Sequence, residues 1–246
     1  MSSEVSEVSK VRSFARRIFI AEAIDDPECD EEKLSRTYAH LAIINEILSR
    51  MGGLLRRYVL EDAARVGGPA TVLEIGCGGG DMLASLARAS ARARVDLRLV
   101  GLDRDPRAVA RARQTLAPYP NAQVHQGSID DLAMLSEQPD YVFCNHVLHH
   151  IPPEDLAPFL RKLRLAARRR LLVNDLERSA VAYGLYTLLA GVAFHKSFVF
   201  ADGRLSIRKG FRVPELEATC VQAGFPPGFR VERIAPWRVV ITAVGG

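Results

Sequence analysis

Short apolar runs alternate with helix-type segments along the chain from residue 71 onward. Short apolar runs bounded by turn residues are typical of buried strands, and apolar residues repeated every three or four positions are typical of helices. The pattern predicts strands over 71–75, 97–102, 123–125, 141–145 and 171–174, and helices over 81–88, 106–116, 154–168 and 213–223. Two final β-type runs, over 229–234 and 239–244, predict a hairpin. Because helices separate the first five strands, we expect an α/β fold with a doubly wound, mostly parallel, seven-stranded sheet.

A helical region precedes this pattern. Apolar residues recur at intervals of three or four over 34–58, which predicts one long helix or a helix broken near Gly52-Gly53. We expect residues 1–66 to form an N-terminal helical extension. It either packs beside the main domain, over 67–246, or forms a lid over its active site.

A second elaboration lies late in the chain, where residues 180–200 are strongly apolar. The segment contains His195 and Lys196, and it barely reaches the ~20 residues that cross a bilayer. It also lies inside an α/β pattern. We therefore expect no stable membrane insertion, but a buried or substrate-covering helix pair within a helical insertion over 179–212.

Composition narrows the class of protein. With 246 residues and 48% hydrophobic content, the chain can form one large domain with elaborations. The net charge is +4, but the basic residues are scattered and form no aromatic-interleaved patch, so we expect no nucleic-acid partner. The four cysteines form no Cys-x-x-Cys pair, and acids precede any apolar run at the N-terminus, which favours a cytoplasmic protein without export. A monomer and a homodimer are both open.

The most informative motif is the glycine-dense turn that follows the strand over 71–75. Its spacing is Glu74-x-Gly76-x-Gly78-x-Gly80, and Asp81 comes next. Glycines allow positive φ angles and let backbone N–H groups approach a ligand closely. The dinucleotide fingerprint Gly-x-Gly-x-x-Gly instead needs an uncrowded helix N-terminus for a diphosphate. Two acids around the turn favour a ligand that carries positive charge, and they oppose a nicotinamide-dependent oxidoreductase.

This turn resembles the first motif of the class I S-adenosylmethionine-dependent methyltransferases, whose cofactor carries an ammonium and a sulfonium. The resemblance implies that Glu74 binds the methionine ammonium, directly or through water, and that the backbone around Gly76, Cys77, Gly78 and Gly80 lies against the cofactor. Asp103 and Arg104 end the next strand. Asp103 lies near the ~20-residue offset at which an acid takes the ribose hydroxyls.

The third strand is followed by Gly127-Ser128-Ile129-Asp130. This segment resembles the methyltransferase region that contacts the adenine, which implies cofactor contacts from Ser128 and Ile129. Asp130 is alternatively a helix cap.

The fourth strand ends in Asn145-His146-Val147-Leu148-His149-His150, which resembles the fourth motif of the small-molecule class I methyltransferases. The resemblance implies that Asn145 and His146 flank the methionyl group, and that His149 and His150 approach the acceptor. The alternative is that one of the two adjacent histidines packs inward on the helix, and we expect that they do not both face the acceptor easily. Asp175, at the fifth strand end, either orients an imidazole or caps the next helix.

The motifs together predict O-methylation of a small hydrophobic, phenolic or quinol-like acceptor by S-adenosylmethionine, with His149 or His150 as the general base and Asp175 behind it. The apolar content of 183–200 and Phe211 favours such an acceptor. Residues 202–211, with the N-terminal extension, resemble more loosely a bacterial methyltransferase group associated with polyketide biosynthesis. C-methylation and a non-catalytic cofactor-binding protein are the alternatives.

Two further expectations concern charged residues. Scattered acids give no cluster for a divalent cation, so we expect no metal. Arg204 and Arg208 either bind an anionic group of the acceptor or pair with surface acids.

Overall fold

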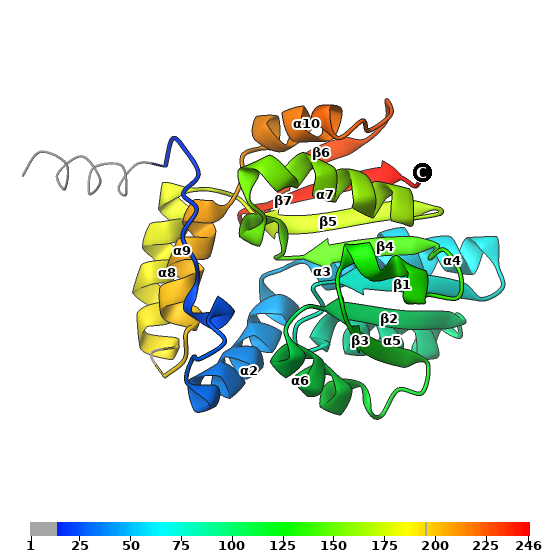
Figure 1. The fold of residues 1–246 in the computed structure, drawn as a ribbon, viewed down its shortest axis with the longest axis horizontal. Helices are drawn as coiled ribbons and strands as arrows, with labels where there is room; N and C mark the ends of the chain where they lie inside the picture. The colour runs from blue at the N-terminus through cyan, green and yellow to red at the C-terminus, as the bar shows by residue number, and fades with distance from the viewer. Residues whose placement is uncertain (1–13, 195) are drawn as a thin grey trace, which may run out of the picture.

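The computed structural model describes residues 14–194 and 196–246, and a seven-stranded sheet runs through its centre (Figure 1). The strand order is β3-β2-β1-β4-β5-β7-β6; β7 pairs antiparallel with both β5 and β6, and all other neighbouring strands are parallel. The strands are β1 (Ala70–Ile75), β2 (Leu97–Asp103), β3 (Ala122–Gln126), β4 (Tyr141–Asn145), β5 (Arg170–Leu176), β6 (Arg230–Ile234) and β7 (Arg238–Val244). The order reverses between β1 and β4, so the carboxyl ends of these two strands flank the ligand crevice that such sheets form. The predicted fold class is confirmed.

Helices cover both faces of the sheet. They are α5 (Asp81–Ala93), α6 (Pro106–Leu116), α7 (Pro153–Ala166) and α10 (Val213–Gln222), with short 3-10 turns η3 (Ile129–Met134) and η4 (Leu148–His150). Side chains of successive strand residues point to opposite faces, so Val72 and Leu73 of β1, both fully buried, belong to separate hydrophobic clusters. The helix start predicted at Pro106 is present, because the Asp105 carboxylate accepts from the backbone N–H of Arg107 at 2.8 Å.

The N-terminal helical region is broken, but not at its glycines. Helix α2 (Glu31–Ile47) is followed by α3 (Met51–Leu55), the π-helical turn η2 (Arg56–Leu60) and α4 (Glu61–Val66). Gly52 and Gly53 lie inside α3, and the break falls at Arg50, whose φ is +61°. The break is stable there because Ser49 Oγ accepts from the N–H of Met51, and Arg238 donates to the carbonyl of Leu48. The predicted break near Gly52-Gly53 is therefore present, two residues before Gly52.

The apolar segment forms two helices, α8 (Ala180–Ala193) and α9 (Val199–Lys209), as a helix pair requires. Helix α9 faces the sheet and buries most of its residues. Helix α8 lies outside it (Figure 1), and four of its apolar side chains are exposed: Val181, Leu185, Leu188 and Leu189. The expected burial thus holds for α9 and not for the outer face of α8. Within the described residues, no helix has the length and apolarity to cross a bilayer.

Residues 14–29, which we call the N-terminal strap, precede α2 and contain one 3-10 turn, η1 (Ala23–Asp25). The strap crosses in front of α9 in Figure 1. The Asp202 carboxylate of α9 accepts from the backbone N–H groups of Ala23 and Ile24 at 2.9 and 3.0 Å. At the other end, the Arg107 guanidinium of α6 donates to the carbonyls of Ile24 and Pro27. The strap therefore joins α9 to α6. Apart from η1, this part of the predicted helical extension is not helical.

Candidate active site

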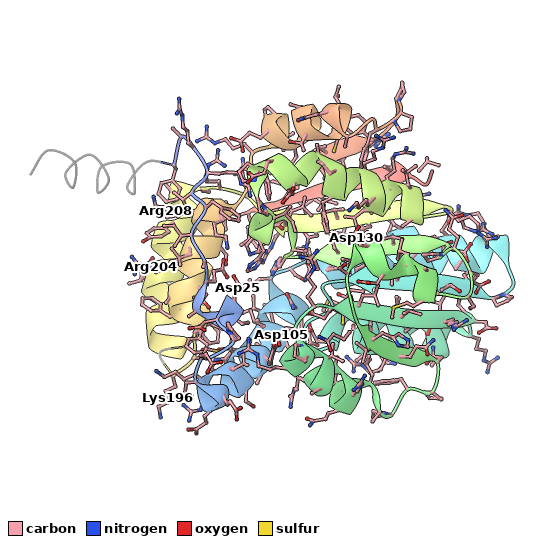
Figure 2. The ribbon with its side chains drawn as sticks, in the orientation of Figure 1. Asp25, Asp105, Asp130, Lys196, Arg204 and Arg208 are labelled. Carbon is pink, nitrogen blue, oxygen red and sulfur yellow. The ribbon has the colours of Figure 1, made fainter. Side chains whose placement is uncertain are left out.

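A cavity of about 860 Å³ lies at the carboxyl ends of the parallel strands. Its floor is formed by the loops that follow β1, β2, β3 and β4, and its other walls come from the strap, α2 and α9. Figure 2 shows Asp25 of the strap and Asp105 of the β2–α6 loop close to these strand ends. The volume lies near the upper end of the ~300–1,000 Å³ that ligand sites span, which suits a cofactor and an acceptor bound together.

The glycine turn has the geometry that the motif requires. Gly76 and Gly78 have φ angles of +70° and +51°, and a Cβ on Gly76 would lie 2.5 Å from Val147 Cγ2. The Gly78 N–H donates to Asp103 Oδ2 at 2.8 Å, which ties the turn to the end of β2. Cys77 is buried and also lines the cavity.

Gly80 has a different place from the one predicted. It precedes α5 with a φ of +77°, and a Cβ there would lie 3.2 Å from Ala112 of α6. Among the described residues that line the cavity, Gly79 is present and Gly80 is not. The requirement for glycine at position 80 therefore comes from the helix start and from packing against α6.

Three carboxylates surround the turn, and burial raises the pKa of each of them. Glu74 is 2% exposed, and the charges of Asp81 and Asp103 raise its pKa further, to well above its usual value. Asp81 and Asp103 also have raised pKa values, although hydrogen bonds to each oppose the effect of burial. Glu74 Oε2 is buried and has no hydrogen-bond partner within the described part of the chain. A buried acceptor beside two further acids fits a ligand with a cationic donor group, such as an ammonium.

The end of β3 matches its prediction in part. Ser128, Ile129 and Arg104 line the cavity. The Ser128 hydroxyl already donates to Asp131 and accepts from the backbone N–H of Asp130, because it caps η3. The predicted cap by Asp130 is therefore wrong, and Asp130 pairs with Lys162 instead. A contact between Ser128 and adenine stays a prediction.

The end of β4 is held by amide and imidazole contacts. The Asn145 side chain donates to Asn45 Oδ1 of α2 at 3.2 Å and accepts from Asn174 Nδ2 at 2.8 Å. His146 has a φ of +60°, and its Nε2 accepts from the Arg238 guanidinium. Burial and the neighbouring charge of Arg238 hold the His146 pKa well below its usual range, so the ring is neutral at pH 7. Asn145 and His146, which the resemblance places beside the methionyl group of the cofactor, both line the cavity. Their contacts with the cofactor stay a prediction.

His149 and Asp175 form a buried pair. His149 Nδ1 lies 2.8 Å from Asp175 Oδ1, and the His149 backbone N–H donates to Asp175 Oδ2 at 3.3 Å. The two residues are 2% and 0% exposed. Burial acts to raise the Asp175 pKa, but the charge and hydrogen bond of His149 outweigh it and hold that pKa well below its usual range. The cap of α8 is Ser179, so of the two predicted roles for Asp175 the structure shows contact with the imidazole.

His150 lines the same cavity as His149, and the expectation that they do not both face the acceptor easily stays a prediction. The two residues belong to the tight turn η4, and their Nε2 atoms lie 3.8 and 3.7 Å from the carboxylate oxygens of Glu22 in the strap. His150 Nδ1 lies 3.1 Å from Asp25 Oδ2. Burial acts to lower the His150 pKa, but the hydrogen bond and charge of Asp25 and the charge of Glu22 outweigh it and raise the pKa.

The sequence interpretation missed the residues that the strap and α9 bring to this cluster. Glu22 Oε1 accepts from Lys209 Nζ at 2.9 Å and from Ser206 Oγ at 2.8 Å. Glu22, His149 and His150 also have potential metal-ligand atoms within 4.8 Å of one another, which the expectation of scattered acids did not foresee. No spacing relates Glu22 to the strand ends, so the sequence held no signal for its place.

Three residues assigned to the acceptor have other contacts. Arg204 donates to the Tyr183 hydroxyl at 2.9 Å and lies over the Phe200 ring, and Arg208 lies over the Phe14 ring. Neither arginine lines the cavity or has an acid partner among the described residues. Phe211 is 1% exposed and belongs to the core. The part of the insertion that does line the cavity consists of Tyr186, Val199, Asp202, Gly203, Ser206 and Ile207.

Comparison with known proteins gives a family-model match for part of the chain and several solved structures of similar fold. Residues 72–169 match the family model described as a methyltransferase domain, and no curated protein matches the chain significantly. The fold is similar to magnesium protoporphyrin IX methyltransferase from Synechocystis PCC 6803 with bound SAH, at 18% identity over 91% of each chain and a TM-score of 0.54. It is also similar to the plantazolicin methyltransferase BamL in complex with a triazolic desmethylPZN analogue and SAH. That comparison gives 17% identity over 85% of this chain and 73% of the other, with a TM-score of 0.59.

A third similar structure is the CurJ carbon methyltransferase, at 12% identity and a TM-score of 0.64. This chain is covered to 91% in that comparison, and it spans 63% of the other chain. Residues 72–169 thus match a methyltransferase domain, and the fold is that of the class I S-adenosylmethionine-dependent methyltransferases. The chain is therefore an enzyme of the methyltransferase type, with S-adenosylmethionine as its cofactor, and these predictions are confirmed.

Proposed function

We propose that this methyltransferase methylates a hydroxyl oxygen of a small, mainly apolar molecule, with His149 as the general base. The observation that carries the proposal is the buried contact of 2.8 Å between His149 Nδ1 and Asp175 Oδ1. A carboxylate at Nδ1 fixes the proton on that nitrogen and leaves Nε2 as a proton acceptor on the cavity side. A phenol or alcohol must lose its proton to become a good nucleophile, and an imidazole is suited to take it.

The acids around the glycine turn form the proposed cofactor-binding half of the site. Glu74 would accept from the methionine ammonium, and Asp103 would accept from the ribose hydroxyls, since its two oxygens each hold one backbone N–H and have a further lone pair. S-adenosylmethionine supplies an electrophilic methyl group. The chain has to hold acceptor and cofactor in line and exclude water, and alignment of this kind is worth up to ~7–11 kcal/mol.

In the proposed reaction, the hydroxyl proton of the acceptor moves to His149 Nε2, and the imidazolium that forms is stabilised by Asp175. The acceptor oxygen keeps its electron pair and forms the bond to the methyl carbon while the bond from that carbon to the cofactor sulfur breaks; the electron pair of that bond stays on sulfur, and S-adenosylhomocysteine leaves. Leu41 and Ile44 of α2, with Val199 and Ile207 of α9, give the cavity apolar walls. These walls support a hydrophobic acceptor.

The experiment is a panel of apolar hydroxylated probes, including 4-hexylphenol and 4-hexylcatechol, with S-adenosylmethionine as methyl donor. We expect formation of S-adenosylhomocysteine together with a methoxy signal in the product NMR spectrum. The nearest alternative is C-methylation, because the same base could remove a phenolic proton and leave carbon as the nucleophile. A new aryl methyl signal would establish that alternative, and cofactor binding without turnover of any probe would refute the proposed acceptor class.

A further inference from the structure

Glu22 is a buried carboxylate of the strap that the proposed reaction does not use. It is 5% exposed and lines the cavity beside the two histidines. Its Oε1 accepts from Lys209 Nζ and Ser206 Oγ, so the buried ammonium of Lys209 compensates its charge. A charge this deeply buried is normally paired and fully hydrogen-bonded. Its Oε2 lies 3.8 Å from His150 Nε2.

The position of Glu22 is fixed from two sides. Asp202 of α9 accepts from the two backbone N–H groups that follow Glu22, and Ser206 and Lys209, on the same face of α9, hold its side chain. Arg107 holds the next turn of the strap from α6. The carboxylate is therefore a fixed part of the cavity wall and not a surface side chain that happens to reach it.

Two hydrogen-bond acceptors thus face the same part of the cavity. His149 Nε2 is an acceptor because Nδ1 carries the proton shared with Asp175, and Glu22 is a carboxylate. The distance from His149 Nε2 to Glu22 Oε1 is 3.7 Å, which is too long for a hydrogen bond between them. Because Oε1 already accepts from Lys209 and Ser206, a bound molecule would donate to His149 Nε2 and to Glu22 Oε2. A single hydroxyl has one proton and can satisfy only one of them at full strength.

We propose that Glu22 selects acceptors that carry a second hydroxyl next to the hydroxyl that is methylated. The inference rests on the proposed function. One hydroxyl gives its proton to His149, and the neighbouring hydroxyl donates to Glu22 and fixes the ring in the cavity. The second hydroxyl stays protonated and unmethylated, so Glu22 acts on specificity and orientation and not as the base. Acceptors of the vicinal dihydroxyarene class meet both requirements.

The expected preference follows from the free energy of the hydrogen bond that the Glu22 carboxylate receives from one probe and not from the other. A hydrogen bond to a charged group is worth ~1.5–3 kcal/mol, which corresponds to a ~10–100-fold preference for 4-hexylcatechol over 4-hexylphenol in kcat/KM. Glu22→Gln should reduce this ratio at least tenfold, because Lys209 draws the amide oxygen and leaves an NH₂ group toward the second hydroxyl. We expect kcat/KM for 4-hexylphenol to change much less than that for 4-hexylcatechol.

The matched control is Glu28→Gln, the same chemical change at an exposed position of the same strap, where the ratio should stay at its wild-type value. The ratio is internal to each variant, so a partial loss of folded enzyme lowers both rates together and leaves it unchanged. Glu22→Asp, which keeps the carboxylate, should restore part of the preference.

Three outcomes would overturn the inference. Equal use of the two probes by the wild-type enzyme would show that the second hydroxyl is not recognised. An unchanged ratio in Glu22→Gln would show that Glu22 does not select the acceptor. A preference that EDTA abolishes in the wild-type enzyme would mean that Glu22, His149 and His150 hold a divalent cation that binds the diol. By contrast, binding of S-adenosylmethionine with no turnover of either probe would contradict the proposed function itself.

Discussion

Replacing Asp175 by Asn tests the general base most directly. The substitution keeps the size of the side chain, and an amide oxygen at the Oδ1 position can still accept from His149 Nδ1 and from the Leu176 backbone N–H, which lie 2.8 and 2.7 Å from it. What it removes is the negative charge opposite the imidazolium that forms during proton transfer, together with the Oδ2 acceptor of the long 3.3 Å contact from the His149 backbone N–H. Both residues are almost completely buried, so water cannot replace that charge.

The magnitude follows from this burial. Leaving a buried charge without its partner costs ~3–5 kcal/mol, and each ~1.4 kcal/mol on the barrier lowers the rate tenfold. Since the proton is only partly transferred in the transition state, we expect the lower part of that range, a ~100-fold fall in kcat. The affinity for S-adenosylmethionine should change little, because Asp175 is not among the described residues that line the cavity.

The assay is the initial rate of S-adenosylhomocysteine formation with 4-hexylcatechol, per active site counted by calorimetric titration with S-adenosylmethionine. Asp140→Asn is the control. Asp140 is also buried and accepts from a backbone N–H, that of Thr71 at 3.0 Å, but it lies at the amino end of β4, away from the cavity. That variant should lose stability and keep its rate per site. A rate for Asp175→Asn within about fivefold of the wild-type rate would refute the role of the pair, since general bases contribute ~10²–10⁴-fold.

Three further predictions follow. Glu74→Gln should weaken S-adenosylmethionine binding ~10–100-fold in calorimetry. Because folding raises the Glu74 pKa, ionisation of Glu74 lowers the free energy of unfolding of the ligand-free protein as the pH rises. The ligand-free variant should therefore be more stable than the wild type at pH 8. Gly76→Ala should lower the free energy of unfolding by ~1–3 kcal/mol in urea denaturation, whereas Gly52→Ala, in a helix with open space, should raise it by up to ~1 kcal/mol. Because folding raises the His150 pKa, protonated His150 stabilises the folded protein below the unfolded pKa of ~6.5, and this stabilisation is lost as the pH rises through the folded pKa. The free energy of unfolding should therefore fall more between pH 6 and 9 in the wild type than in His150→Gln.

Much of the fold and of the cofactor half of the site could be predicted from the sequence, because both depend on local patterns. Alternating apolar runs and helices determine parallel crossovers, and the ends of parallel strands must meet at one edge of the sheet. Glu74 and Asp103 lie at the carboxyl ends of β1 and β2, so that rule alone brings them together at one edge. The histidine turn follows β4, and Asp175 lies at the carboxyl end of β5; His149 of that turn and Asp175 are in contact in the structure.

Only the tertiary structure decided what covers this edge and how its charges are balanced. Glu22 meets Lys209, a residue 187 positions away, and no periodicity relates the two. The break at Arg50 depends likewise on Arg238 from the last strand, a contact that outweighs the local preference of Gly52-Gly53 for a turn. Local sequence determines the strands and what stands at their ends. Long-range packing determines which buried charges are paired, and hence which of them face a bound molecule.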